Sequence, residues 1–591
     1  MRKLLAIILG AVMMLSLVIV GASAADPEVI TTAEQFAAMT AGGNYKLGND
    51  ITVAASYADK FTGTFDGDGK KITTSVPLFA DLSGTVKNLT IEGAVDGTNA
   101  QTGALASKST DGCNVEKVTN NANVTVSADS FKGYRDGTYG AGFVAFATGE
   151  CTFKDCVNNG SVTSETTHVS GFVGYADNVA LTFTGCTNNG LVKNEKAKTR
   201  TGGFVGCDGK NNDGKTFTIT LTNCKNTADI TGGDQVGGLV GWTMSNVVVK
   251  NCSNSGKIVS TQNYAGGLVS RPGDDFSKTY ADCPASTFTN CKNTGEVISF
   301  NSQAAGMASY VCTPIECTGC TNSGKITVDK NGEGTNGYAA GMIGKAAVAA
   351  AKHYVVCTDC TNTGEMYGGQ VAAGICGSAG ASKNDAGDKH YTFTNCKNTG
   401  KMTGVKTYAA GIIGYVYGDS GTGQYAVLDK CVNTGDLYGG KGAFVSNFVA
   451  YTNDQMTTIK NCIGSGKCYA IKEGETPYLV VFGCSSAGVS DGSTVSVCPI
   501  ENNVLIENSG IEYYSYATAE ANAVNIIKFE DYLAAHPTAF SIKTAAEINE
   551  LLNPTTPTGP ATPTGDTAVI VMIVCLVSLL GMGIALKARK A

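Results

Sequence analysis

Two Cys-x-x-Cys pairs, Cys317 with Cys320 and Cys357 with Cys360, have the spacing of a zinc site or of a thioredoxin-like redox pair. Histidines would be expected beside a mixed zinc site, but the four in the chain form no cluster: His168, His353, His390 and His536. The chain also carries 22 cysteines in all, a number that in an exported protein suggests disulfides. The sequence around the pairs distinguishes between these chemistries.

The cysteines belong to a ten-residue phrase that recurs twelve times between Val86 and Cys468, for example as FTNCKNTGEV from Phe288. Its fourth position is cysteine in most copies but Leu89 and Val118 in the first two. A position that accepts Leu and Val is a buried apolar position. We therefore predict that these cysteines pack in a core, and we predict no metal and no cofactor.

Successive copies of the phrase are 28 to 40 residues apart, a period typical of solenoids, propellers and arrays. Eight copies are preceded by a glycine box of the form small-Gly-apolar-apolar-small, as in GGLVG ending at Gly241. Both segments resemble short strands between tight turns, and the 3.6-residue helical period is absent. Copies of uneven length fit an open stack better than a closed propeller. We predict an all-β fold, a right-handed parallel β-helix of about twelve repeats with short helical caps.

At the glycine box the chain resembles the GLUG-motif repeats of bacterial surface proteins and adhesins, over roughly Gln101 to Cys468. Its N-terminal part is similar to the first coils of pectin-lyase-like β-helices. That resemblance implies a short capping helix within Ile30 to Met39 and the first coils within Tyr45 to Ile72. It implies a fold and a surface location, and it does not specify a ligand.

An asparagine follows the cysteine by two residues in nine copies, from Asn158 to Asn433. In stacked coils each side-chain amide can donate to the next, which predicts an asparagine ladder. The alternative is a set of solvated turn asparagines that favour the left-handed conformation.

Pectin-lyase-like folds include polysaccharide lyases and hydrolases, which need paired carboxylates or a basic residue beside calcium. The only adjacent carboxylates in the repeats, Asp274 and Asp275, lie in a Gly/Pro turn, so we predict a non-catalytic protein. Long insertions at one phase of a solenoid project from one edge and are our candidate binding loops. Their candidate residues are Asp208, Asp213, Arg271, Asp274, Asp275, Tyr280, Asp385, Asp388 and Tyr391.

The two ends of the chain carry export and anchoring signals. Arg2 and Lys3, an apolar run and Ala22-Ser23-Ala24 predict a signal peptide. Near the C-terminus a Pro/Thr/Gly spacer precedes about 19 apolar residues, enough to span a bilayer, and then a basic tail. This end resembles a Gram-positive sorting signal, which implies sortase cleavage between Thr564 and Gly565. Pro563 directly precedes Thr564, unlike in the usual pattern, so a plain membrane anchor stays open.

These observations predict six segments along the chain. They are a signal peptide at 1–24, an N-terminal cap with the first coils at 25–85, the repeat β-helix at 86–505, a C-terminal cap segment at 506–552, the spacer at 553–567 and the anchor with sorting tail at 568–591.

For function we predict a cell-surface adhesin or ligand-binding rod whose partner is a glycan or matrix protein of a host or neighbouring cell. Further predicted contacts are the membrane through the C-terminal helix and, if sortase acts, peptidoglycan. A net charge of -7 with few arginines argues against nucleic acid. A structural surface-layer component without a ligand and a polysaccharide lyase or hydrolase are the alternatives.

Overall fold

The computed structural model describes residues 26–554, apart from 99, 128–137, 166–167, 195, 197, 210–216, 245, 274–283, 330–336, 347–353, 381–390, 418–425, 453–456, 485–499 and 518–526. The chain divides into two compact units, Met1–Ile542 and Lys543–Ala591. The predicted signal peptide, the bond between Thr564 and Gly565 and the predicted anchor all lie outside the described residues. Within them, no helix is both long and apolar enough to cross a membrane.

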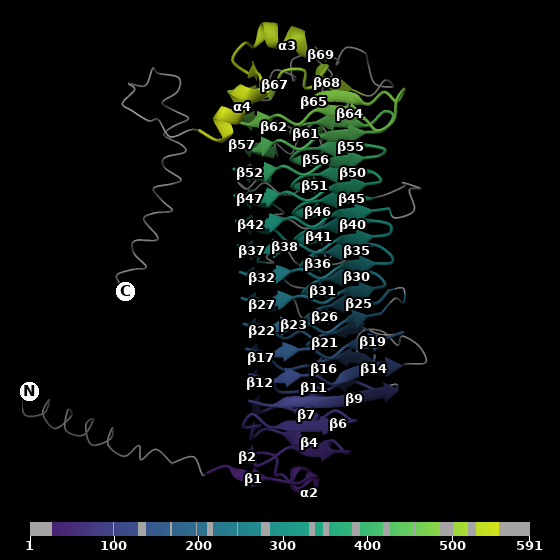
Figure 1. Ribbon diagram of the computed structural model, residues 1–591, viewed down its shortest axis with the longest axis vertical. Coiled ribbons are helices and arrows are strands. Elements are labelled where there is room, and N and C mark those ends of the chain that lie inside the picture. The colour runs from purple at the N-terminus through teal and green to yellow at the C-terminus, as the bar shows by residue number, and fades with distance from the viewer. Residues whose placement is uncertain are drawn as a thin grey trace, which may run out of the picture. The chain divides into compact units, whose positions relative to one another are not determined.

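The first unit is a stack of coils in which every coil adds one step to three parallel sheets (Figure 1). One coil illustrates the order. Strand β37 (Ser286–Thr289) lies in the first sheet, β38 (Lys292–Asn293) and β39 (Val297–Ser299) in the second, and β40 (Gln303–Ala305) and β41 (Ala308–Val311) in the third. The corresponding strands of neighbouring coils pair in parallel and in register. The predicted all-β parallel stack is therefore confirmed.

Among the described residues the first sheet contains 16 strands, whereas the phrase occurs twelve times. The twelve copies correspond to the strands from β8 (Thr85–Lys87) to β62 (Thr457–Lys460). Four further strands lack the phrase: β1 (Glu28–Ile30), β2 (Asn44–Leu47), β5 (Thr64–Asp66) and β66 (Ile500–Glu501). The sheet is longer than the repeat count because backbone pairing needs only an extended segment of the right length, whatever its sequence.

A short helix, α2 (Ala33–Ala37), lies at the N-terminal end of the core, within the predicted span. It begins at a capping box: the Thr32 hydroxyl accepts from the Gln35 backbone N–H at 3.3 Å, and the Gln35 side chain accepts from Thr32 N–H at 3.2 Å. Phe36 is fully buried, and its ring lies 5.7 Å from those of Phe65 and Phe79. The helix therefore covers apolar side chains that the first coils would otherwise expose.

A turn with a left-handed residue joins the first sheet to the second in each coil. This residue is the third of the phrase, and its φ is +52° at Asn290 and +63° at Gly319. Asn, Asp and Gly tolerate this conformation best, which explains their frequency there. The next residue, the phrase cysteine, points into the core; Cys291 is 1% exposed, and its thiol donates to the carbonyl of Val249 at 3.4 Å. The prediction that this position is a buried apolar one is confirmed.

The asparagine ladder is also confirmed, and it lies inside the core rather than at the surface. Asn293 Nδ2 donates to Asn322 Oδ1 of the next coil at 2.8 Å and to the carbonyl of Gly295 at 2.9 Å. The same pair of bonds recurs in successive coils from Asn120 to Asn433, all within 3.1 Å. Each buried amide is thus satisfied by its neighbours along the stack.

The glycine of the box is required because it packs against this ladder. A Cβ on Gly306 would lie 2.7 Å from Asn322 Oδ1 and 2.3 Å from the carbonyl oxygen of Gly341. Both distances are shorter than a carbon atom allows. The repeated box and the repeated asparagine are therefore two halves of one packing arrangement.

The C-terminal end of the first unit departs from the repeat. Strand β67 (Asn503–Ile506) continues the second sheet, whereas β68 (Tyr513–Ala517) pairs antiparallel with β69 (Ile527–Lys528). Helix α3 (Phe529–Ala535) and strand β70 (Phe540–Lys543) follow, and Phe529 and Phe540 pack with their ring centres 5.5 Å apart. In the second unit the described element is α4 (Ala545–Leu552), which begins at a capping box of Thr544 and Glu547.

Candidate functional site

The structure describes three of the predicted loop residues and buries all three. Asp208 ends β26 (Val205–Asp208), Arg271 lies in β36 (Val269–Pro272), and Tyr391 begins β52 (Tyr391–Thr394). Their exposed fractions are 1%, 5% and 2%, and Tyr391 belongs to the main core. The other candidates lie outside the described residues: Asp213, Asp274, Asp275, Tyr280, Asp385 and Asp388. The loop surface therefore stays a prediction. The three described residues belong to strands and not to loops.

The structure reveals a different grouping, two columns of large side chains on the third sheet that we name the box-flank stripe. The columns consist of the residues three positions before and four positions after each box glycine, or after Asn447 where it takes the glycine's place, and neighbours within a column are in register. The first column contains Tyr139, His168, Arg200, Gln235, Tyr264, Gln303, Tyr338, Val371, Tyr408 and Phe444. The second contains Phe146, Tyr175, Cys207, Trp242, Arg271, Tyr310, Lys345, Ser378, Tyr415 and Tyr451.

The stripe lies outside the main core. The side chains between the two columns, such as Phe143 and Val144, belong to the main core, whereas Tyr139, Tyr175 and Trp242 form a separate cluster. A Cβ on Gly174 would lie 3.2 Å from Cβ of Tyr139 in the preceding coil, so the small box residues let the strands of adjacent coils approach closely. That close approach places the two columns side by side on the outer face of the sheet.

The N-terminal part of the stripe is buried and tightly packed. The rings of Tyr139 and Tyr175 stack 4.6 Å apart, and the Arg200 guanidinium lies 5.0 Å from the Trp242 ring. The backbone N–H of Arg200 donates to His168 Nδ1 at 2.9 Å. Burial, and then the charge of Arg200, hold the pKa of His168 well below its usual value, so this imidazole is neutral.

From Tyr264 onward most of the stripe is half-exposed, and two cationic side chains, Arg271 and Lys345, lie among its aromatic ones. Arg271, itself buried, places its guanidinium 5.2 Å from the Tyr310 ring, and Lys345 Nζ is 5.5 Å from the Tyr338 ring. Further along, the Tyr408 ring lies 5.4 Å from Tyr415 and 5.3 Å from Tyr451. From the coil of Tyr264 to that of Phe444 the half-exposed stripe spans five coil steps, about 24 Å. This surface could hold an extended ligand by ring stacking and by charge.

Two glutamines in the stripe add buried polar atoms. Gln235 and Gln303 are 2% and 6% exposed, and their Oε1 atoms have no hydrogen-bond partner. A buried amide oxygen without a partner costs free energy. A ligand that donates a hydrogen bond there would recover that cost.

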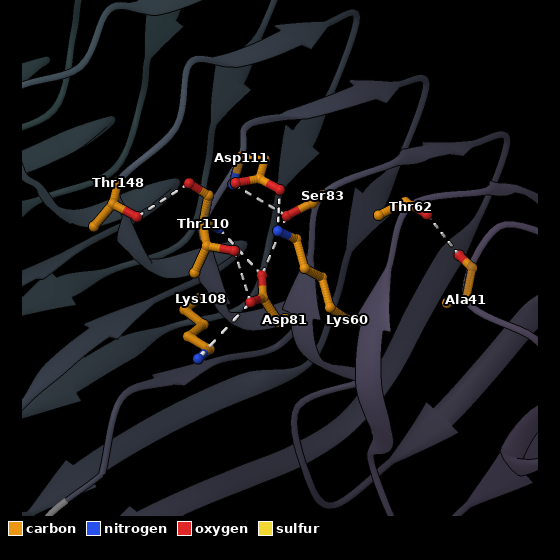
Figure 2. A network of polar contacts seen from close by, with 9 residues as sticks. All are labelled: Ala41, Lys60, Thr62, Asp81, Ser83, Lys108, Thr110, Asp111 and Thr148. Carbon is orange, nitrogen blue, oxygen red and sulfur yellow. Dashed lines mark hydrogen bonds and ion pairs between the residues drawn. The ribbon is translucent and has the colours of Figure 1, made fainter.

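At its N-terminal end the second column continues into a polar network (Figure 2). Lys60, Asp81 and Lys108 occupy the same register position on the preceding strands. The Asp81 carboxylate accepts hydrogen bonds from the backbone N–H of Thr110 at 3.1 Å and from the Thr110 hydroxyl at 2.8 Å. It also lies 3.8 Å from Lys108 Nζ, and Lys60 forms an ion pair with Asp111 (Figure 2). These charges neutralise one another. The net positive charge of the second column therefore comes from Arg271 and Lys345 in the later coils.

The sequence predicts packing cysteines with no metal and no cofactor, and the structure shows how these side chains lie. In the part of the chain that the structure describes, no three His, Cys, Asp or Glu side chains lie close enough to hold a metal ion. Burial raises the pKa of the Cys431 thiol well above its usual value, which disfavours the reactive thiolate. His536 caps α3 beside Tyr532, with ring centres 4.5 Å apart, while His353 and His390 lie outside the described residues.

Sequence reasoning missed the box-flank stripe although its signal is present. Tyr or another large side chain recurs three residues before the box glycine, and a second one recurs seven residues after the first, as in Tyr408 and Tyr415. A search for large residues at a spacing of seven across each box would have found both columns.

The comparisons with known proteins show no family. No family model matches the chain, and no curated protein matches it. Among solved structures the chain is similar to a "putative immunoglobulin A1 protease" from Bacteroides ovatus, with 15% identity and a TM-score of 0.25, over 54% of this chain and 84% of that one. At this TM-score the similarity carries no argument about activity.

Proposed function

We propose that the protein is a non-catalytic, ligand-binding rod of the GLUG-motif surface type, held at the cell surface by its C-terminus. The observation that carries the binding role is the box-flank stripe. Aromatic rings lie half-exposed outside a core that is already complete, where coil stability does not require them. A right-handed coil, the export signal and the anchor are parts of this proposal that rest on the sequence.

The ligand that fits the stripe is extended and bears acidic groups, either a glycan or a segment of a matrix protein. Among the described members of the half-exposed part, Arg271 and Lys345 are cationic and none is a carboxylate. Guanidinium and ammonium groups bind carboxylates and sulfates through charge-assisted hydrogen bonds. The predicted loops begin where the strands of the second column end, for example after Pro272, so they would border the same surface.

The only tryptophan of the chain, Trp242, adjoins the half-exposed part, with its ring 5.9 Å from the Arg271 guanidinium, and provides a reporter of binding there. We expect a heparin oligosaccharide, or gelatin as a matrix-protein probe, to change the tryptophan fluorescence of the full chain on titration. Lys345→Gln and Tyr338→Ala should each weaken binding about tenfold, and raising the salt concentration should weaken it further. Thr392→Ala, on the outer face of the first sheet, is the matched control and should bind as the parent does.

The loops are tested separately by replacing residues 274–280 with a short Gly/Ser turn, which leaves the buried Arg271 in place. Loss of binding with an unchanged melting temperature would support the loops as part of the site. Absence of binding to any glycan or matrix protein would instead favour the structural surface-layer role. Release of reducing or unsaturated sugar by the purified chain would establish an enzyme and refute the proposal.

A further inference from the structure

A second aromatic surface lies on the second sheet, away from the box-flank stripe. Five successive strands form it: β44 (Ile326–Val328), β49 (Met366–Gly368), β54 (Met402–Gly404), β59 (Leu437–Gly439) and β64 (Cys468–Ala470). Their middle residues are in register and point outward, and we name them the tyrosine platform: Thr327, Tyr367, Thr403, Tyr438 and Tyr469. The residues beside them, such as Met402 and Leu437, are buried.

The rings at one end of the platform form an open stacking surface. Tyr438 and Tyr469 stack with ring centres 5.1 Å apart and planes 25° apart. Tyr469 is 39% exposed and is one of four exposed large hydrophobic residues among those described. Exposed aromatic rings in register on a flat sheet offer a face to which a planar or ring-shaped ligand can pack.

Next to these rings the sheet surface is hollowed. A depression of about 180 Å³ is lined by Lys325, Thr327, Glu365, Tyr367, Lys401 and Thr403, together with Met366. Lys401 Nζ lies 4.2 Å from the centre of the Tyr438 ring and so connects the depression to the stacked pair. The hollow therefore combines an apolar ring face with hydroxyl, ammonium and carboxylate groups from three successive coils.

The charges along the platform alternate in sign from coil to coil. Two positions before each middle residue stand Lys325, Glu365, Lys401, Asp436 and Lys467. Each charge thus has an opposite charge on the adjacent strand, about 4.8 Å away along the stack. The sum over five coils is 3 - 2 = +1, so the platform has little net attraction for a polyanion or a polycation.

We propose that the tyrosine platform binds a neutral oligosaccharide. A sugar ring presents apolar C–H faces, which pack on the Tyr438 and Tyr469 rings, and hydroxyl groups at its edge. Those hydroxyls can donate to Glu365 and accept from Lys325 or Lys401. The four steps between Thr327 and Tyr469 cover about 19 Å, the length of a short linear oligosaccharide rather than of one sugar.

The platform differs from the box-flank stripe in residues and in ligand. The stripe carries a cation excess, whereas the platform is charge-balanced. The platform also contains no tryptophan, so its occupation should leave the Trp242 fluorescence unchanged. The two binding proposals can therefore fail independently.

The test is isothermal titration of the full chain with maltohexaose and with cellohexaose. We expect one of the two to bind, with an affinity that does not change between low and high salt. Tyr469→Ala should weaken binding several-fold, and Tyr438→Ala with Tyr469→Ala about tenfold or more. Tyr438→Phe retains the ring and should bind nearly as the parent does.

Val259→Ala is the matched control, because Val259 is an outward middle residue of β34 (Ile258–Ser260) on the same sheet, outside the platform. It should bind as the parent does, and circular dichroism should show all variants folded. Three results would overturn the proposal: no binding of either hexasaccharide, binding unchanged in the double variant, or self-association of the full chain that Tyr469→Ala abolishes. The last result would mean that the platform covers a second copy of the chain.

Discussion

Exchanging Asn447 and Gly464 should leave stability almost unchanged, whereas either substitution alone should destabilise the β-helix. In the preceding coils a ladder asparagine faces a box glycine. In the last ladder coil the two residue types are exchanged: Gly464 occupies the ladder position and Asn447 the box position. Asn433 Nδ2 donates to Asn447 Oδ1 at 2.7 Å, and Asn447 Nδ2 donates to the carbonyl of Gly466 at 2.9 Å. Asn447 therefore completes the ladder from the opposite strand.

The structure provides the size of each effect. Asn447→Gly removes two buried hydrogen bonds and leaves polar atoms unsatisfied, which costs about 3 kcal/mol. Gly464→Asn adds a Cβ 2.8 Å from both Asn447 Cβ and Leu505 Cδ2 and costs about 2 kcal/mol through overpacking. In the double variant the new amide at 464 can make both bonds and only the end of the flexible Leu505 side chain must shift, so we expect a net change below about 1 kcal/mol. The coupling free energy between the two sites is then about 4 kcal/mol.

Long repeat arrays do not unfold in one step, so the assay must report on these coils. Hydrogen exchange read by mass spectrometry at the amides of Cys431 to Ser465 supplies a local free energy of opening for the parent and the three variants. Protection should fall in each single variant and return in the double. If the two single effects simply add, then the two residues do not share one space, and the account of the ladder and the box is wrong.

Four further outcomes are expected. Gly306→Ala should lower the melting temperature by several degrees, because its Cβ meets the Asn322 amide; Ala305→Gly is the control. Burial raises the pKa of Asp208 to about 7, so the folded state binds this proton more tightly than the unfolded state does. Stability should then fall by roughly 4 kcal/mol as pH rises from about 4 through 7, and Asp208→Asn should flatten that pH profile. The Cys431 thiol should react with a thiol reagent only after unfolding, and reductant should barely change the melting temperature. A chain truncated before Thr564 should be shed into the medium, because it loses the apolar span. If sortase acts, only wall digestion should release the full-length protein. Release by detergent alone would indicate a plain membrane anchor.

Much of the fold could be predicted from the sequence because the stack repeats its contacts. Leu89 and Val118 at the cysteine position identify it as buried, and nine regularly placed asparagines predict a ladder. In a solenoid each residue meets its own equivalent in the next coil, so a column in space is a period in the sequence. The first sheet has more strands than the phrase has copies, because β1, β2, β5 and β66 pair through backbone groups and need no motif.

The candidate sites could not be predicted from the sequence repeat alone. The sequence predicts loop positions for Asp208, Arg271 and Tyr391, but the structure places them at buried positions in strands. Backbone pairing with neighbouring strands decides where each strand ends, and the repeat does not show this. The tyrosine platform required knowing that Tyr367, Tyr438 and Tyr469 share one outward face, which the alternation of side chains along each short strand determines.

The sequence by itself determined which residues repeat, and therefore which stack on one another: the cysteines, the asparagines and the box glycines. Only the tertiary structure decided which columns face one another across the coil. It placed the box glycine against the ladder amide and the two box flanks side by side. The physical reason is that contacts along the stack follow the repeat, whereas contacts across a coil depend on where the chain turns between sheets. A few backbone angles, such as the left-handed φ of Asn290, set the positions of these turns.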